Sequence, residues 1–296
     1  MDIVISGSHG LIGSALIPAL SAAGHRPIRL VRGEPKGDEI KWDPAAQTID
    51  SASLDGCGGV VHLAGAGIGD KRWTPAYKAE LVESRTKGTS TLAGALSGLA
   101  NKPTVMVSGS AVGIYGSRGD EELTEDSKVG TGFLADLCVQ WEAASEAASA
   151  AGIRVANIRT GIVLSAKGGA LKKQLPLFKI GFGGRFGSGK QWQSWISLDD
   201  EIRAIIHLLS ADVSGPVNLT APTPVTNAQF TRTLGAAVHR PTPFPIPAFG
   251  PKLLLGAELA QNLLFDGQKV LPTKLSASGF TFNHPTLDVA LKALLA

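Results

Sequence analysis

A glycine-rich turn directly after a short apolar strand limits the fold of this chain more than any other feature. The strand "DIVIS" leads into "GSHGLIG", where three glycines recur at three-residue intervals, and an apolar helical pattern follows. Residues without a Cβ let the backbone turn tightly beside a pyrophosphate, and the N–H groups at the start of the helix attract the anion. In a chain with 36 glycines the triplet alone is weak, but its position after the first strand favours a phosphate-binding turn. We assign to this turn Gly7, Ser8, Gly10, Leu11, Ile12 and Gly13.

Strand and helix patterns alternate along residues 1–221. Apolar runs at 27–32, 59–68, 104–108, 152–164 and 215–222 indicate strands, and long connections separate them. Such connections require parallel strands with right-handed crossovers. With 44% hydrophobic and 18% charged residues, the chain can bury a large core. We predict an α/β fold: a Rossmann-like doubly wound parallel sheet, covered on both faces, with a smaller, mostly helical C-terminal substrate subdomain.

The end of the second strand indicates the kind of dinucleotide. An NAD-binding protein commonly places Asp or Glu there to bind the ribose 2′-hydroxyl, whereas this chain has Arg32 after Val31. A guanidinium can hold a 2′-phosphate with two hydrogen bonds, so we predict NADP(H) as the cofactor. The alternative is a solvated surface arginine. After the strand that begins at residue 59, the small residues of "LAG" leave room for the cofactor, and we assign Leu63, Ala64 and Gly65 to its wall.

Hydroxyl side chains follow two later strands. Ser108 and Ser110 in "SGSAVGIYG" and Thr160 in the polar break "RTG" are predicted to lie at the same carboxyl edge of the sheet. Ser110 can orient a substrate carbonyl, or it can cap backbone groups in the turn. Tyr115, one of two tyrosines, is a candidate acid, and the alternative is that it packs in the core.

The composition changes after residue 164. Residues 165–195 are rich in glycine, lysine and aromatic residues, and from Pro222 onward we expect two or three helices and a proline-rich linker. We predict an NADP-binding Rossmann domain over 1–164, completed by about 191–221, and a substrate or lid subdomain over 165–190 and 222–296. The lysines of the first segment can recognise an anionic substrate, or they can be solvated charges on a flexible loop.

These segments resemble an atypical group of the extended short-chain dehydrogenase/reductases, named nucleoside-diphosphate-sugar epimerase-like or SDR39U1-like. The matching motifs span nearly the whole chain: "GLIGSAL", "HLAG", "ESR", "SAVGIYG", "WEAA", "RTGIVL", "GSGKQWQSWISLDD", "GPVNLTAP" and "VLPTKL". The resemblance implies that Ser110 holds the position of the family's catalytic Ser or Thr. It also adds Glu80 and Arg85 of the long helix to the cofactor-binding residues.

The resemblance also shows a loss. The family's YxxxK pair, counted back from Glu142 of "WEAA", falls on Leu134 and Cys138, and the family's helical Asn is replaced by Arg85. A leucine transfers no proton, and a thiol with an ordinary pKa near 8.5 is mostly neutral at pH 7. Cys138 can still touch the nicotinamide end, and Arg85 can restore a positive charge from the neighbouring helix. The catalytic candidates are therefore Ser110, Cys138 and Tyr115.

Two functions remain open at this point. One is an NADP(H)-dependent oxidoreductase or epimerase-like enzyme acting on a small carbonyl or sugar-like substrate, which can be anionic. The other is an inactive NADP(H)-binding sensor or interaction protein. The net charge of +3 is scattered and no apolar run spans a bilayer, so we expect a cytoplasmic protein with no nucleic-acid or membrane partner, and we allow for a homodimer. The histidines and the two cysteines lack ligand spacing, so we predict no metal site.

Overall fold

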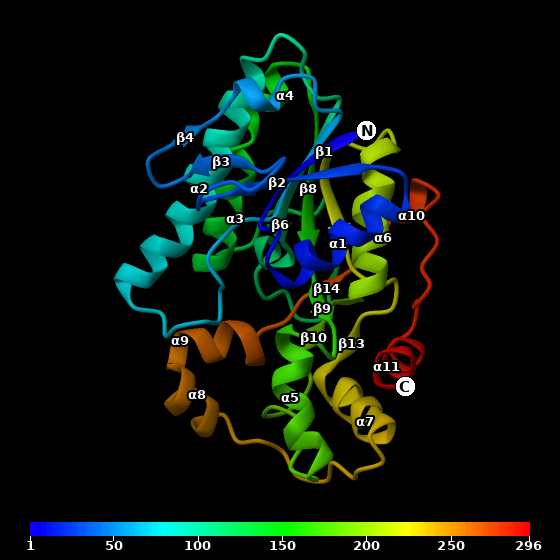
Figure 1. Ribbon diagram of the computed structural model, residues 1–296. Helices are drawn as coiled ribbons and strands as arrows, with labels where there is room; N and C mark the ends of the chain where they lie inside the picture. The colour runs from blue at the N-terminus through cyan, green and yellow to red at the C-terminus, as the bar shows by residue number, and fades with distance from the viewer.

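An eight-stranded sheet forms the centre of the computed structural model, which describes residues 1–296 (Figure 1). The strand order is β12-β8-β6-β5-β1-β2-β3-β4, and every neighbouring pair is parallel except β3 and β4. The strands are β1 (Asp2–Ser6), β2 (Arg26–Val31), β3 (Ile40–Asp43), β4 (Thr48–Ile49), β5 (Gly59–His62), β6 (Val105–Ala111), β8 (Arg154–Thr160) and β12 (Gly215–Leu219). The chain order runs outward from β1 in both directions, so the carboxyl ends of β1 and β5 flank the switch point where such sheets bind ligands. This topology confirms the predicted fold class.

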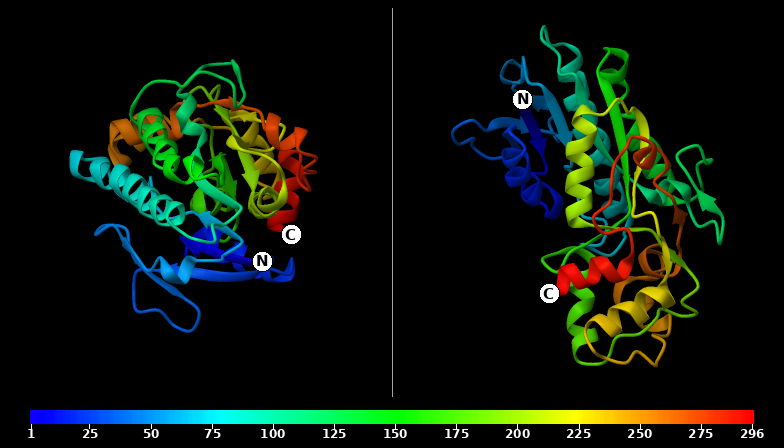
Figure 2. Two further views of the ribbon diagram at one scale, coloured as in Figure 1. Left: turned by 90° about the horizontal axis from the view of Figure 1, so that it is seen from above. Right: turned by 90° about the vertical axis from the view of Figure 1, so that its right-hand side faces the viewer.

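Helices cover both faces of the sheet (Figures 1 and 2). The first face carries α1 (Leu11–Ala22) and α6 (Leu198–Ser210), which pack together, and the other carries α2 (Pro75–Ser97), α3 (Phe133–Ala143) and α4 (Glu146–Ala150). The alternation of β1 explains why both faces are apolar: Ile3 and Ile5 join the core beneath α1 and α6, whereas Val4 joins the core beneath α2.

The carboxyl edge of the sheet faces a second group of shorter elements, at the lower end of Figure 1. These are α5 (Gly169–Lys179), α7 (Asn227–Ala237), α8 (Phe249–Leu255), α9 (Ala257–Ala260), a π-helical turn (Gln261–Phe265) and α11 (Leu287–Leu295), while α10 (Thr273–Ala277) packs against β12. Three small pairs complete the fold: β7 (Glu122–Leu123) with β14 (Lys269–Val270), β9 (Ile162–Leu164) with β11 (Trp195–Ser197), and β10 (Trp192–Gln193) with β13 (Val225–Thr226). Short 3₁₀ turns cover Ala52–Leu54 and Val112–Tyr115.

Two expectations from the sequence differ from this structure. Five helices and a π-helical turn follow Pro222, where two or three helices were expected, because α8, α9 and α10 are too short to produce a helical period in the sequence. The predicted strand over 59–68 ends at His62, and residues 63–67 form the loop that follows it. None of the helices combines the length and the apolar composition needed to cross a membrane.

A buried carboxyl lies in the first turn of α6. Glu201 has no exposed surface, and it accepts a hydrogen bond at Oε1 from Thr160 Oγ1 at 2.9 Å. Its Oε2 has no hydrogen-bond partner. Burial opposes ionisation and raises the pKa of Glu201 to about 8, although the bond from Thr160 acts in the opposite direction. Glu201 is therefore a neutral acid in the folded protein near pH 7.

This buried acid predicts a pH-dependent stability. An unfolded Glu ionises above a pKa near 4.5, whereas folded Glu201 keeps its proton up to about pH 8. Rising pH across that window favours the unfolded state, so the contribution is fully present below pH 4.5 and is lost by pH 8. Glu201→Gln removes the titration, and we expect the difference in Tm, variant minus wild type, to increase from pH 5 to pH 8. Thermal unfolding at several pH values measures this, with the exposed Glu146→Gln as control; a pH-independent difference would contradict the assignment.

Candidate functional site

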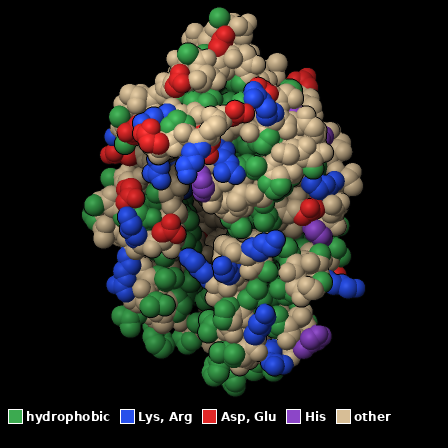
Figure 3. Space-filling view, in the orientation of Figure 1, with side chains coloured by type: hydrophobic (Ala, Val, Ile, Leu, Met, Phe, Trp, Pro, Cys, Tyr) green, Lys and Arg blue, Asp and Glu red, His purple; other side chains and the backbone are tan.

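The site is a large cleft at the carboxyl ends of β1, β2 and β5. Its volume is about 1270 Å³, and Figure 3 shows this face of the molecule hollowed near its centre, with Lys and Arg side chains around the hollow. Nine of the residues predicted to bind the cofactor line it: Gly7, Ser8, Gly10, Val31, Arg32, Leu63, Ala64, Gly65 and Glu80. The structure therefore brings together the ends of β1, β2 and β5 and one residue of α2, although Gly7 and Glu80 lie 73 residues apart in the sequence.

The first loop has room for backbone only. Gly7 has a φ of +70°, and a Cβ there would lie 2.7 Å from the carbonyl carbon of Leu63. A Cβ on Gly13 would lie 2.3 Å from the Gly7 carbonyl oxygen. No side chain caps α1 at Gly10, so the N–H groups of its first turn are not satisfied by a capping side chain. A glycine cradle that leads into an uncapped helix start fits a pyrophosphate.

Basic side chains surround the end of β2. Arg32 is exposed in the cleft lining, and its guanidinium forms no ion pair and no hydrogen bond with the protein. Arg29 and Lys36 line the same part of the cleft, and Arg29 lies 3.9 Å from Glu39 Oε1. The sequence analysis missed these two residues, although the basic run "RLVRGEPK" contains both. This end of the cleft thus offers an unpaired guanidinium where a dinucleotide's adenosine ribose would lie.

Ser110 is buried, does not line the cleft, and uses its hydroxyl proton in a hydrogen bond within the protein. Ser110 Oγ donates to Glu142 Oε1 at 2.6 Å, and Arg159 Nε and Nη2 donate to the two oxygens of the same carboxylate at 2.8 and 2.9 Å. Only 7% of the Arg159 side chain and 15% of the Glu142 side chain are exposed, so water screens this ion pair weakly. The sequence analysis used Glu142 only as a counting landmark and Arg159 only as a polar break. Charged residues inside apolar segments were the signal for this pair.

Tyr115 lies in the interior of the protein. Its phenol has no exposed surface, donates to Asn218 Oδ1 at 2.6 Å and accepts from Arg159 Nη1 at 2.9 Å. Burial raises its pKa, against the effect of the Arg159 hydrogen bond. These contacts favour the packing alternative over a role as a catalytic acid.

The positions of the missing Tyr and Lys are apolar. Leu134 packs against Gly113, and Cys138 is only 2% exposed. Burial, with a smaller effect of the Glu142 charge, raises the pKa of the Cys138 thiol to about 12, so this thiol carries no charge at neutral pH. Neither residue replaces the lost ammonium.

A buried cation lies close to this helix instead. Arg85 is 9% exposed, its Nη1 donates to the Leu81 carbonyl at 3.1 Å, and its guanidinium lies 4.9 Å from the centre of the Trp141 ring. No carboxylate pairs with it, its Nε has no partner, and burial lowers its pKa. A Cβ on Gly65 would lie 3.4 Å from the guanidinium carbon, so Arg85 adjoins the wall of the cleft.

Of the other residues predicted to bind the cofactor, Ser108, Thr160, Leu11, Ile12 and Gly13 lie outside the cleft lining. Ser108 is fully buried and its Oγ has no partner, whereas Thr160 is half-buried and donates to Glu201. Leu11, Ile12 and Gly13 form the start of α1 behind the glycine turn. Glu80, which does line the cleft, pairs through Oε2 with Lys71 at 3.0 Å.

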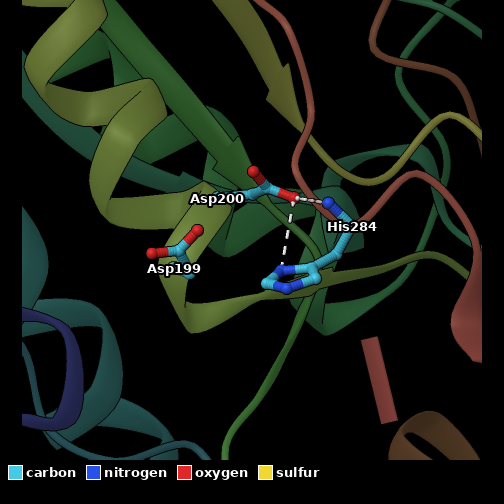
Figure 4. A group of neighbouring side chains, drawn as sticks. All are labelled: Asp199, Asp200 and His284. Carbon is cyan, nitrogen blue, oxygen red and sulfur yellow. Dashed lines mark hydrogen bonds and ion pairs between the residues drawn. The ribbon is translucent and has the colours of Figure 1, made fainter. Parts of the chain in front are cut away.

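One cluster resembles a metal site, but both oxygens of its buried carboxylate, Asp200, already accept hydrogen bonds. Asp199, Asp200 and His284 bring their candidate ligand atoms within 4.8 Å of one another. Figure 4 shows Asp200 directed at the backbone of His284, whose N–H donates to Oδ2 at 2.8 Å, while the Asn283 N–H donates to Oδ1 at 2.9 Å. This carboxylate therefore fastens the segment before α11 to the start of α6.

Comparison with known proteins agrees with this geometry. The model of the NAD dependent epimerase/dehydratase family matches residues 3–220, and a domain of unknown function, DUF1731, matches residues 246–294. The epimerase family protein Mb2239 of Mycobacterium bovis is 45% identical over 98% of this chain and 96% of its own length. The crystal structure of human epimerase family protein SDR39U1 with NADPH has a TM-score of 0.91 at 34% identity, covering 100% of this chain and 99% of that chain.

A nucleoside-diphosphate sugar epimerase from Corynebacterium glutamicum is 38% identical with a TM-score of 0.82, covering 100% of this chain and 58% of that chain. These similarities extend over the sheet, the cleft and the C-terminal elements. They confirm the resemblance that the sequence motifs indicated. The chain belongs to the NAD dependent epimerase/dehydratase family, in the group of epimerase family proteins that includes SDR39U1.

Proposed function

We propose that this protein binds NADP(H) and transfers hydride to or from a small carbonyl or sugar-like substrate, as an oxidoreductase or epimerase-like enzyme. The observation that carries the cofactor assignment is the unpaired Arg32 at the end of β2, in the same cleft as a glycine cradle and an uncapped helix start. The NADPH in the human SDR39U1 structure supports it. When bound, the cofactor would supply or accept the hydride, and the protein would bind, orient and protect the substrate.

The hydrogen bond of Ser110 determines how it can act on a substrate. Its proton is donated to Glu142, so its free lone pairs can accept a hydrogen bond from a substrate hydroxyl. Donation to a carbonyl would require the hydroxyl to turn away from Glu142. The observed arrangement thus favours an alcohol or a sugar hydroxyl in the ground state. Arg85, buried beside Gly65, is one of two positive charges that act on Cys138 at the predicted lysine position of α3, and we assign it to the nicotinamide end of the cofactor.

A second candidate function is an NADP(H)-binding sensor without turnover. The neutral, buried Cys138, the apolar Leu134 and the interior position of Tyr115 support it, since none of them supplies an obvious proton donor at the substrate. Against it, the protein contains the polar group Ser110–Glu142–Arg159, although burying an ion pair costs desolvation energy.

Removal of the Arg32 guanidinium tests the cofactor assignment. We expect Arg32→Ala to weaken NADPH binding about 10- to 100-fold, because a charge-assisted contact to the 2′-phosphate contributes about 1.5–3 kcal/mol. NADH binding should change by less than about threefold, since NADH lacks that phosphate. Fluorescence titration of both nucleotides measures this, with the exposed Arg232→Ala on α7 as control. An unchanged ratio of the two dissociation constants would exclude Arg32 from the 2′-phosphate site.

Transfer of labelled hydride distinguishes the enzyme from the sensor. The protein is incubated with NADPH deuterated at the nicotinamide C4 and a panel of aldehydes, ketones and keto sugars, and products are examined by mass spectrometry. We expect deuterium in at least one product and a loss of at least about 100-fold in rate for Ser110→Ala, but not for the exposed Ser149→Ala. Tight NADPH binding without any label transfer would support the sensor function instead.

A further inference from the structure

The end of the molecule farthest from the amino ends of the strands carries an exposed apolar cluster. Six large side chains there are between 65% and 79% exposed, and we call them the apolar tip: Ile180, Phe182, Phe244, Phe249, Leu253 and Leu254. No other residues with large apolar side chains are more than half exposed; elsewhere the highest values are 49% for Met1 and 48% for Val129. Several large exposed apolar side chains at one end of a molecule are a feature of interaction sites.

The two segments that form the apolar tip touch each other. Arg240 Nε donates to the Lys179 carbonyl at 3.0 Å, and the Ile246 N–H donates to the Arg185 carbonyl at 2.7 Å. Residues 240–246 therefore run along residues 179–187, and α8 follows directly with Leu253 and Leu254. None of the residues of α8 is buried, so this helix presents apolar side chains without a protein partner for them. Figure 1 places α8 and the C-terminal end of α5 at the same end of the molecule.

The charge around the apolar tip is positive. Residues 165–190 contain six basic residues and no acidic residue: Lys167, Lys172, Lys173, Lys179, Arg185 and Lys190. Residues 239–266 add Arg240 and Lys252 against Glu258 and Asp266. On the face drawn in Figure 3, hydrophobic side chains gather at the lower end, blue side chains lie above and among them, and the acidic side chains lie mostly in the upper half. The two segments that carry the apolar tip thus together have a net positive charge.

We propose that the apolar tip inserts into the surface of an anionic lipid membrane, with the basic side chains around it bound to lipid phosphates. Protruding Phe and Leu side chains combined with Lys and Arg are suited to the boundary between headgroups and acyl chains. This contact needs no spanning helix, so it is compatible with the absence of one. The prediction of no membrane partner from the sequence considered only a spanning segment. The inference is independent of the proposed hydride transfer.

A second copy of the chain fits the apolar tip less well. A two-fold dimer would place the same surface of both subunits face to face, so each basic group would approach its equivalent in the partner. Glu258 and Asp266 are too few to neutralise these charges, and Glu258 already pairs with Lys78 at 2.6 Å. An anionic membrane offers acyl chains to the apolar side chains and lipid phosphates to the basic side chains.

Vesicle sedimentation with the full chain tests the proposal. We expect binding to vesicles of phosphatidylcholine and phosphatidylglycerol in equal parts, and at least about tenfold weaker binding to phosphatidylcholine alone, since the basic side chains need anionic lipid. Leu253→Asp/Leu254→Asp should weaken binding at least about tenfold by removing inserted apolar surface and adding negative charge. Lys172→Glu/Lys173→Glu should also weaken binding to the anionic vesicles at least about tenfold, and should leave the weak binding to phosphatidylcholine vesicles unchanged.

The matched control is Val129→Asp/Val289→Asp, which adds the same charges at two exposed valines outside the apolar tip and should leave binding unchanged. Circular dichroism and NADPH titration verify that each variant is folded. Three results would overturn the proposal: no binding of the wild type to anionic vesicles, equal loss in the control variant, or a wild-type dimer that Leu253→Asp/Leu254→Asp converts to a monomer without any vesicle binding.

Discussion

The close approach of the turn after β1 to the loop after β5 is the constraint on which the rest of the molecule depends. With less than 3 Å between a Cβ on Gly7 and the backbone of Leu63, these two segments can be adjacent only if the first has no side chain. Their contact sets the distance between the ends of β1 and β5. The uncapped start of α1 then lies on one side of the cleft, and the backbone of residues 63–65 lies on the other. The shape of the cleft thus depends on packing at one place in the fold.

A different interaction organises the deeper half of the site. The ion pair between Glu142 and Arg159 joins α3 to β8, and through Ser110, Tyr115 and Asn218 it reaches β6 and β12. Loss of one partner would leave a poorly solvated charge and lower the free energy of unfolding, so this group stabilises the fold as well as positioning Ser110. The group therefore ties α3 to three neighbouring strands of the sheet without any contribution from Leu134 or Cys138.

The features that depend on a local sequence pattern could be predicted from the sequence. The period of the strands and helices predicted the parallel sheet, and the glycine turn and Arg32 were assigned from their positions along the first two strands. The short strands β3 and β4 were not predicted, because four- and two-residue strands are stabilised by pairing rather than by a local pattern. The Glu142–Arg159 pair was missed for a related reason: its partners lie 17 residues apart on different elements, and only the tertiary structure brings them together.

The attachment of α8 has a mechanical consequence. Asp70 and Lys71 line the cleft, and the next residue, Arg72, donates through Nε and Nη2 to the carbonyls of Leu253 and Leu254 at 2.6 to 3.1 Å. No residue of α8 is fully buried, so these hydrogen bonds contribute to holding the helix in place. A shift of the cleft wall at Asp70 and Lys71 must therefore either move α8 as well or break the hydrogen bonds of Arg72. The position of the helix is thus coupled to the position of the wall through one guanidinium.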